Sequence, residues 1–143
     1  MDYFKQAHVT YHTRYHIVFP TKYRRGILRK GLGAYVVIIL KRLTKQFPDV
    51  VIVEAKADID HLHMCVTIPP KYAVSDIVQY LKGASARAMR RQFPFLNNVY
   101  YGADGIWSDG YFVSTTGITE AIIRRYVQEQ GREDMGQATL GLE

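Results

Sequence analysis

The amino-acid sequence predicts a single α+β domain that spans residues 1–143. A chain of 143 residues of which 48% are hydrophobic is long enough for one core and too short for two. Its hydrophobic residues follow strand and helix periods in the order strand, helix, strand, strand, helix, strand, and a further helix follows. This order is the split βαβ arrangement of a ferredoxin-like sandwich, in which the first and third strands are neighbours at the centre of the sheet.

The first half of the chain supplies three strands and one helix. Residues 11–19 are rich in aromatic and β-branched side chains and stop at a proline, which predicts the first strand. Apolar residues at helical spacing predict a helix over 32–47, again closed by a proline. Residues 50–57 predict the second strand. The short turn 58–60 leads into a third strand that ends at two prolines, so we expect a hairpin.

The second half supplies two helices and one strand. Apolar spacing predicts a helix over 74–89. Residues 94–110 show no period and hold several turn formers, which predicts a loop before a fourth strand at 111–115. A third helix is predicted from a threonine N-cap at 119 to 130, just before a glycine. The polar tail 131–143 is predicted to be disordered.

The segment Asp60-His61-Leu62-His63-Met64-Cys65-Val66 carries the clearest chemical signal. Side chains alternate along a strand, so His61, His63 and Cys65 share one face while the intervening apolar residues share the other. Two imidazoles on a stiff face can bind one divalent cation with little ordering cost. An isolated His-x-His pair is more often two surface histidines, so a third ligand and a reactive group are needed to identify a metal site.

Three histidines near the start of the chain are a second metal-site candidate. Their four-residue spacing would place His8, His12 and His16 on one face of a helix. We favour the strand, which leaves His12 and His16 together on one face and His8 at the surface.

Composition narrows the class of partner and the compartment. The formal net charge is +6, and the Lys and Arg residues cluster, which favours nucleic acid over membrane as partner. No apolar run approaches the roughly 20 residues that span a bilayer. The single cysteine, Cys65, excludes an internal disulfide and a thiolate-rich zinc site. We expect a cytoplasmic protein.

Tyr126 and Gln130 are candidates for the reactive group and the third ligand. They are four residues apart on the third predicted helix and share a face with Ile118 and Ile122. An amide oxygen together with two imidazoles can hold Mg²⁺ or Mn²⁺ and leave positions open for water or a phosphate oxygen. The alternative is a core or interface tyrosine, since the chain has eleven tyrosines.

Four segments together resemble a known family. They are YHIVFPTKYR, DHLHMCV, IWSDGYFVSTTG and IRRYVQEQ, and they resemble the ordered motifs of the single-tyrosine HUH transposases of the insertion-sequence 200/605 family. The resemblance implies that His61 and His63 are the family's histidine pair, Tyr126 its nucleophile and Gln130 its helix-borne metal ligand. It also implies a ferredoxin-like fold, a homodimer and action on single-stranded DNA hairpins at the ends of the element, near the nucleoid.

The clusters of basic residues supply the candidate DNA contacts. The candidate contacts from the basic clusters are Lys22, Arg24, Arg25, Lys82, Arg87 and Arg124. The acidic turn Asp109-Gly110 departs from the family pattern and puts contacts there in doubt.

The implied chemistry agrees with elementary reactivity. A tyrosine has a pKa near 10 and is a poor nucleophile at neutral pH, so a nearby cation must stabilise the charge that develops. Attack by Tyr126 would give a 5′-phosphotyrosine and a free 3′-hydroxyl, and the exchange is reversible without a nucleotide cofactor. Gly117 precedes the tyrosine helix and would let it dock on a partner subunit, as the family's composite sites imply.

Two other functions remain open at this stage. One is an HUH nickase of the replication or relaxase type, with the same chemistry and another substrate. The other is a basic ferredoxin-like module that binds RNA without catalysis. Such modules stack bases on aromatic residues of the central strands, whereas here the third strand carries histidines at those positions and no Phe-rich signature.

Overall fold

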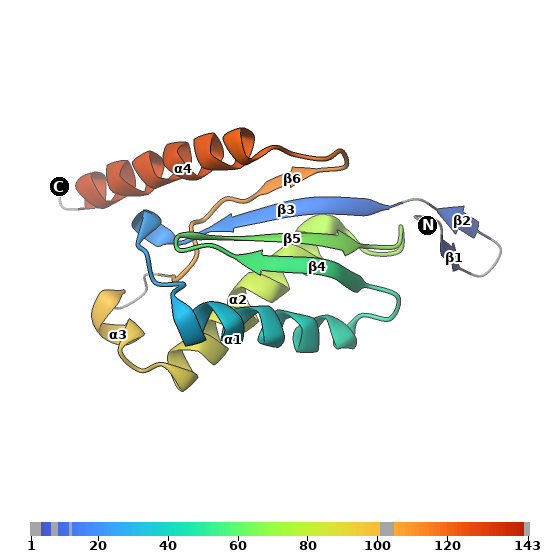
Figure 1. Cartoon of the computed structure of the whole chain (residues 1–143), viewed down its shortest axis with the longest axis horizontal. Helices are drawn as coiled ribbons and strands as arrows, with labels where there is room; N and C mark the ends of the chain where they lie inside the picture. The colour runs from blue at the N-terminus through green and yellow to red at the C-terminus, as the bar shows by residue number, and fades with distance from the viewer. Residues whose placement is uncertain (1–3, 7–8, 12, 101–104, 142–143) are drawn as a thin grey trace.

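The computed structural model describes the backbone at 4–6, 9–11, 13–100 and 105–141, and the side chains at 13–100 and 105–136. In this part of the chain a four-stranded antiparallel sheet carries helices on both faces (Figure 1). The α+β class is therefore confirmed. His8 and His12 lie outside the described residues, so their expected placement stays a prediction.

The main sheet has the strand order β4-β5-β3-β6. Its strands are β3 (Arg14–Pro20), β4 (Val51–Ala57), β5 (His61–Thr67) and β6 (Phe112–Ser114). At the centre β3 pairs with β5, and each of these strands also pairs with one edge strand. The first and third strands of the ferredoxin-like core are thus central neighbours, as the element order predicted.

One face of the sheet is covered by two helices, α1 (Lys30–Leu43) and α2 (Val74–Gln92). Alternate residues of the central strands, such as Ile17 and Met64, pack there in the main hydrophobic core. The helix residues of this core include Val36 and Leu81, which are both 0% exposed. The period-2 pattern that predicted the strands is therefore a direct consequence of this one-sided burial.

The opposite face is covered by α4 (Glu120–Gly141), which Figure 1 shows on the far side of the sheet from α1 and α2. Val18 of β3 packs there with Ile123 and Val127 of α4, and all three are at most 5% exposed. Thr119 caps the helix, since its Oγ1 accepts a hydrogen bond from the Ile122 amide at 3.2 Å. The predicted N-cap is confirmed.

The predicted end of this helix at 130 is wrong, because α4 continues through Gly131 to Gly141. Gly131 lies against the Arg24 side chain, where a Cβ would approach Arg24 Cβ to 3.2 Å. One turn later Asp134 is fully buried and bound to Ser108 and to the Tyr23 amide. Tertiary contacts therefore hold a segment that its local sequence did not predict to be helical.

Three other boundaries differ from the predictions. The first predicted strand begins at Arg14, where its partner β5 ends, while Tyr11 belongs to a separate hairpin of β1 (Phe4–Gln6) and β2 (Val9–Tyr11). The first helix gives way at Thr44–Gln46 to a 3₁₀ turn, η2, because Phe47 turns away to pack on Tyr80. The predicted loop holds one helical turn, α3 (Leu96–Val99), which is too short to show a period.

None of the helices in the described residues is long and apolar enough to cross a bilayer.

Candidate active site

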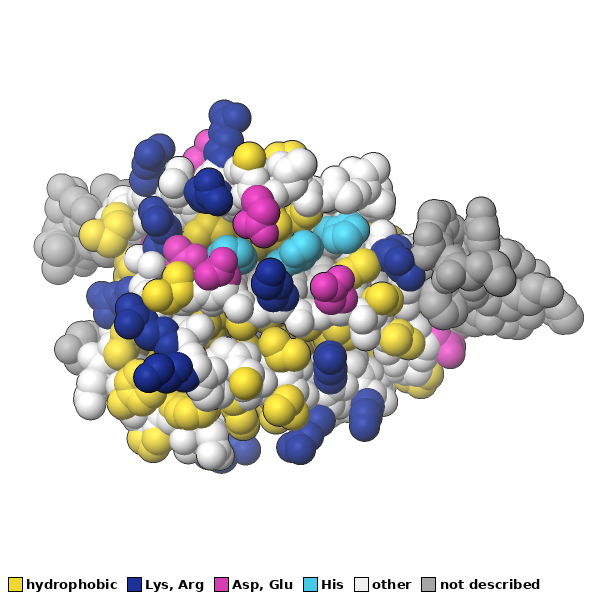
Figure 2. Space-filling model, viewed as in Figure 1, with side chains coloured by type: hydrophobic (Ala, Val, Ile, Leu, Met, Phe, Trp, Pro, Cys, Tyr) yellow, Lys and Arg dark blue, Asp and Glu magenta, His cyan; other side chains and the backbone are white. Residues whose placement is uncertain are grey.

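The described histidines lie in a row on the sheet face that carries α4 (Figure 2). His61 and His63 alternate with the core residues Leu62 and Met64, as the strand pattern predicted. His16 of the neighbouring strand β3 completes the row, with its Nδ1 3.4 Å from His63 Nε2. The sequence predicted His16 on a strand face but not this contact, because the contact depends on the register between β3 and β5.

The two histidines of the pair have different surroundings. His61 Nδ1 lies 3.0 Å from Asp60 Oδ1, so the carboxylate holds the ring from one side. Burial lowers the pKa of His63, and the neighbouring His16 lowers it further. A neutral imidazole is the form that binds metals, so the site favours the ligand form of His63 near neutral pH.

These donors fit a divalent cation only in combination with other ligands. In the described part of the chain no group of three or more His, Cys, Asp or Glu side chains is arranged to hold a metal. Cys65 shares the histidine face and is buried, which agrees with its interpretation as a small flanking residue. A cation bound by His61 and His63 would therefore take further ligands from an amide, from water or from a bound phosphate.

Tyr126 and Gln130 lie together on the flank of α4 that faces β6. The Tyr126 hydroxyl is 3.5 Å from Gln130 Oε1, and its ring packs on Phe112 at 5.5 Å between centroids. Burial, helped by the carboxylates of Glu133 and Asp134, raises the pKa of Tyr126 to about 12. The hydroxyl is therefore protonated at neutral pH and needs help to act as a nucleophile.

Gly110, just before β6, leaves room for this pair. A Cβ on Gly110 would lie 2.9 Å from Gln130 Oε1 and 3.3 Å from the Tyr126 hydroxyl. Gly110 of the turn Asp109-Gly110 therefore lies against the two predicted site residues. The glycine is required by this close approach.

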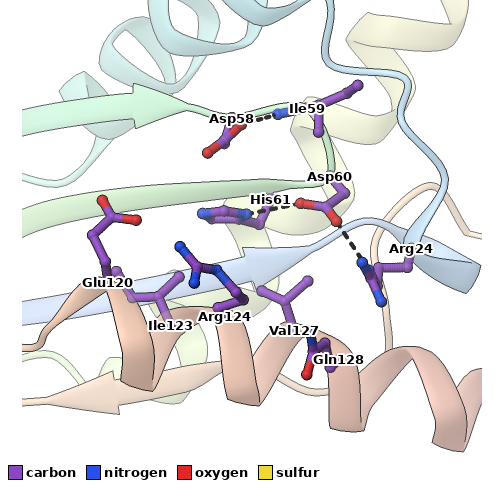
Figure 3. A pocket seen from close by; sticks show the side chains of 10 residues that line it. All are labelled: Arg24, Asp58, Ile59, Asp60, His61, Glu120, Ile123, Arg124, Val127 and Gln128. Atoms are coloured by element: carbon purple, nitrogen blue, oxygen red, sulfur yellow. Dashed lines mark hydrogen bonds and ion pairs between the residues drawn. The ribbon is translucent and has the colours of Figure 1, made fainter.

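The other flank of α4 faces His61. A cavity of about 210 Å³ lies between this flank and the turn that joins β4 to β5. Figure 3 shows the side chains that line it, among them Arg124 and Gln128 of α4 on one side and His61 on the other. Tyr126 and Gln130 are absent from this lining.

The structure therefore forms both predicted pairs and does not join them. Val18 of β3 pairs with His63 of β5 on one side and with Phe112 of β6 on the other. Two strand spacings separate the backbones of His63 and Phe112, or about 10 Å. Tyr126 packs over Phe112, so in this docking of α4 it lies to the side of the histidines.

Two of the predicted DNA contacts have amines that are largely buried by interactions within the protein. Lys22 is 8% exposed, and its Nζ lies 3.5 Å from Asp109 and 3.8 Å from Asp134. Lys82 Nζ donates to the carbonyl oxygens of Ser108, Asp109 and Gly110, and burial lowers its pKa. Both amines stabilise the segment before β6, which the sequence could not reveal because the contacts are long-range.

The other four predicted contacts, Arg24, Arg25, Arg87 and Arg124, are exposed. Arg24 pairs with Asp60 at 3.1 Å and Arg25 donates to the Val99 carbonyl, and all four side chains still reach solvent, where a phosphate group could contact them. Arg25 also packs its guanidinium over the Tyr23 and Tyr100 rings, at 5.2 and 5.4 Å from the centroids.

Asp134 is a buried neighbour of the candidate site that the sequence did not point to. Its carboxylate accepts a hydrogen bond from Gln130 Nε2 at 3.5 Å, which orients the amide so that Oε1 faces Tyr126. Tyr126, Gln130 and Asp134 follow one another at four-residue spacing along one stripe of α4. The spacing was visible in the sequence, but the helix was predicted to end before it.

Comparisons with known proteins identify the family of the chain. Residues 9–130 match the profile of the family described as "Transposase IS200 like". The transposase for insertion sequence element IS200 of Salmonella typhimurium is 40% identical over 136 residues, which cover 92% of this chain and 86% of the relative. The ISDra2 transposase TnpA of Deinococcus radiodurans is 31% identical over 122 residues, which cover 84% of this chain and 85% of the relative.

Two solved structures share the fold. A crystal structure from Deinococcus radiodurans R1, described as that of a transposase, has a TM-score of 0.77 and 29% identity, and covers 88% of this chain and 96% of that one. A REP-associated tyrosine transposase bound to a REP hairpin has a TM-score of 0.54 and 16% identity, over 80% of this chain and 62% of that one. The second likeness concerns the fold alone.

These likenesses place the chain among transposases, enzymes that cleave and rejoin DNA. More narrowly, the chain belongs to the IS200-like transposase family, because the family profile covers most of it and a relative at 40% identity spans 92% of it. Membership in a transposase family sets aside the RNA-binding module that the sequence left open.

Proposed function

We propose that this transposase cleaves and rejoins single-stranded DNA at hairpin-marked ends of an insertion sequence, with Tyr126 as the nucleophile. The observation that carries the proposal is the position of the Tyr126 hydroxyl. It lies next to Gln130, on the helix that covers the sheet face with His61 and His63. The relatives named as transposases of insertion sequence elements support the ends of such an element as the substrate.

The proposed reaction is a reversible exchange of phosphodiester bonds. The Tyr126 oxygen forms a bond to the scissile phosphorus and loses its proton, while the bond from phosphorus to the DNA 3′-oxygen breaks. The products are a 5′-phosphotyrosine and a DNA 3′-hydroxyl. Attack by a 3′-hydroxyl on the phosphotyrosine reverses these steps, which joins strands and releases Tyr126 without a nucleotide cofactor.

His61 and His63, together with Gln130 of a tyrosine helix docked over them, would hold Mg²⁺ or Mn²⁺, which when bound supplies Lewis acidity at the scissile phosphate. Tyr126 has a pKa raised to about 12, so its attack depends on stabilisation of the negative charge that develops as the hydroxyl loses its proton. Asp134 would keep the Gln130 amide oxygen directed toward the phenol.

We further propose that the transposase is a homodimer with composite active sites. In the docking described here, Tyr126 packs over β6 and lies to the side of the histidines on β5. Gly117, in the connection before α4, is exposed, and a Cβ at this position would have no atom within 4 Å, so it is free to act as a hinge. A helix that swings at Gly117 can bring Tyr126 to the histidine pair of the partner.

The first test is the trapping of a covalent adduct. The full chain is incubated with labelled single-stranded DNA hairpins from its own element ends, with and without Mg²⁺. Tyr126→Phe should eliminate the adduct, and Tyr111→Phe, a matched half-buried tyrosine nearby, should keep it. His61→Ala or His63→Ala should stop cleavage while hairpin binding persists. An adduct that mass spectrometry maps to Tyr100, Tyr101 or Tyr111 would show that the nucleophile is assigned wrongly.

The second test addresses the composite site. Tyr126→Phe and His63→Ala proteins, each inactive alone, are mixed under conditions of subunit exchange. Random exchange makes about half of the dimers mixed, so about a quarter of the wild-type number of sites should be restored. If mixed dimers form and cleavage stays absent, each subunit uses its own tyrosine.

A further inference from the structure

Asp60 connects the metal-ligand candidate His61 to Arg24. Asp60 Oδ1 lies 3.0 Å from His61 Nδ1, and Arg24 Nε donates a hydrogen bond to Asp60 Oδ2 at 3.1 Å (Figure 3). The side chains of Asp60 and His61 are only 18% and 14% exposed. A carboxylate in such surroundings interacts more strongly with an imidazole N–H than it would in water.

The backbone of Asp60 is fixed independently of its carboxylate. Its carbonyl oxygen accepts hydrogen bonds from the Thr21 amide at 3.0 Å and from Thr21 Oγ1 at 3.1 Å. The preceding residue, Ile59, accepts a hydrogen bond from the Leu28 amide at 3.0 Å. A change of the Asp60 side chain therefore leaves the turn between β4 and β5 anchored.

Arg24 is held in an unusual conformation that presents it to Asp60. Tyr23 and Arg24 have φ angles of 60° and 55°, in the left-handed region that non-glycine residues rarely adopt. Such strain persists only where the surroundings fix the residue. Here the stem of Arg24 packs against Gly131 of α4, and the Tyr23 amide donates to Asp134 of the same helix at 3.0 Å.

We propose that Asp60 is a positioning residue for His61, and that Arg24, supported by α4, holds Asp60 in place. The proposal rests on the proposed function, because it assigns His61 to a metal site. When His61 Nδ1–H donates a hydrogen bond to the carboxylate, Nε2 is the ring nitrogen whose lone pair is free to bind a metal. The ring is then fixed in one tautomer, presents Nε2 to a cation and becomes a stronger ligand.

The experiment measures the affinity for Mn²⁺ alone, without DNA, on the full chain by calorimetry. Asp60→Ala should raise the Kd about 10- to 100-fold. Asp60→Asn should raise it less, because an amide oxygen still accepts from Nδ1–H but lacks the charge that binds Arg24. Asp49→Asn is the matched control, since Asp49 pairs with Lys71 at the opposite end of β4 and should leave the Kd unchanged.

Arg24 has its own test, because it is also a candidate DNA contact. Arg24→Gln should raise the Mn²⁺ Kd, by less than Asp60→Ala does. Arg125→Gln is the control, since Arg125 pairs with Glu129 on an exposed part of α4. An unchanged Mn²⁺ Kd together with weaker hairpin binding would make Arg24 a DNA contact and overturn its role in holding Asp60.

Nitrogen-15 NMR of the imidazole rings gives a readout that a general loss of structure would not imitate. Wild-type His61 should carry its proton on Nδ1, and in Asp60→Ala the two tautomers should mix while the melting temperature stays close to that of Asp49→Asn. A wild-type proton on Nε2, or a wild-type Kd in Asp60→Ala, overturns the positioning role and leaves the metal site standing. Cleavage that needs no divalent cation, with no Mn²⁺ binding by the wild type, overturns the metal site and the positioning role together.

Discussion

Replacing Asp134 by alanine should release the C-terminal half of α4 from the body of the protein. The carboxylate is fully buried and accepts hydrogen bonds from Ser108 Oγ at 2.6 Å and from the Tyr23 amide at 3.0 Å. It also forms an ion pair with Lys22 Nζ at 3.8 Å. Removal of one member of a buried ion pair destabilises a protein by roughly 3–5 kcal/mol. Lys22 keeps Asp109 as a partner, so we expect the lower end, about 3 kcal/mol.

The loss should be local because the rest of α4 has its own anchor. Ile123 and Val127 are almost fully buried against Val18, and burial of such side chains contributes about 1.5–3 kcal/mol each. The N-terminal half of α4 should therefore stay docked while residues 131–141 open. With about 1.4 kcal/mol per factor of ten, the amides of 131–141 should exchange their hydrogens about 100-fold faster.

Native-state hydrogen exchange, read residue by residue, checks this expectation. The central strands β3 and β5 should keep their protection, since their core lies on the other face of the sheet. Glu133→Ala changes the exposed neighbour of Asp134 and should shift stability by less than about 0.5 kcal/mol. Unchanged protection at 131–141, or an equal loss in the central strands, would refute the view that Asp134 holds α4 locally.

Three further predictions concern the surroundings of Tyr126 and the DNA surface. Gly110→Ala should lower adduct formation and destabilise the protein by about 1–3 kcal/mol, because the new Cβ would meet Gln130 Oε1 at 2.9 Å. Gly83→Ala in α2, whose Cβ would find only the tip of Arg87 at 3.4 Å, should instead stabilise by about 0.5–1 kcal/mol in the same denaturation assay. Lys82→Met should destabilise by about 1–3 kcal/mol, because it leaves the carbonyls of Ser108, Asp109 and Gly110 without their donor; a melting curve like that of the wild type would count against this clamp. Arg124→Gln should weaken hairpin binding and reduce the slope of log affinity against log salt concentration by about one phosphate contact. Lys71→Gln, remote from α4, should change neither the affinity nor the slope.

The histidine pair could be predicted from the sequence because its cause is local. Alternation over the seven residues of β5 separates Leu62 and Met64 from His61 and His63, and burial on one face of the sheet enforces that separation. The register that brings His16 to His63 is a property of two strands 47 residues apart. The residue pattern within a single strand therefore cannot predict this register.

The end of α4 could not be predicted because local and tertiary signals conflict there. Gly131 is a common helix stop in sequence, and the polar residues after it show no apolar stripe. In the structure the same glycine is required by the Arg24 side chain, and Asp134 is buried one turn later. A glycine selected for close packing and a glycine that ends a helix look the same in one sequence.

The rotation of α4 about its axis was the decisive unknown for the active site. A shift of one residue turns a helix by about 100°, and both Ile122 and Ile123 are apolar, so the sequence allows either to face the sheet. In this docking Ile123 is 5% exposed and Ile122 is 44% exposed. Burial of Ile123 and Val127 therefore turns Tyr126 toward β6 and Arg124 toward His61.

The alternative rotation would bury Ile122 and carry Tyr126 toward the middle of the sheet. An exposed isoleucine on the tyrosine side of α4 is what a helix with a second docking surface would retain, whether that surface lies on its own sheet or on a partner's.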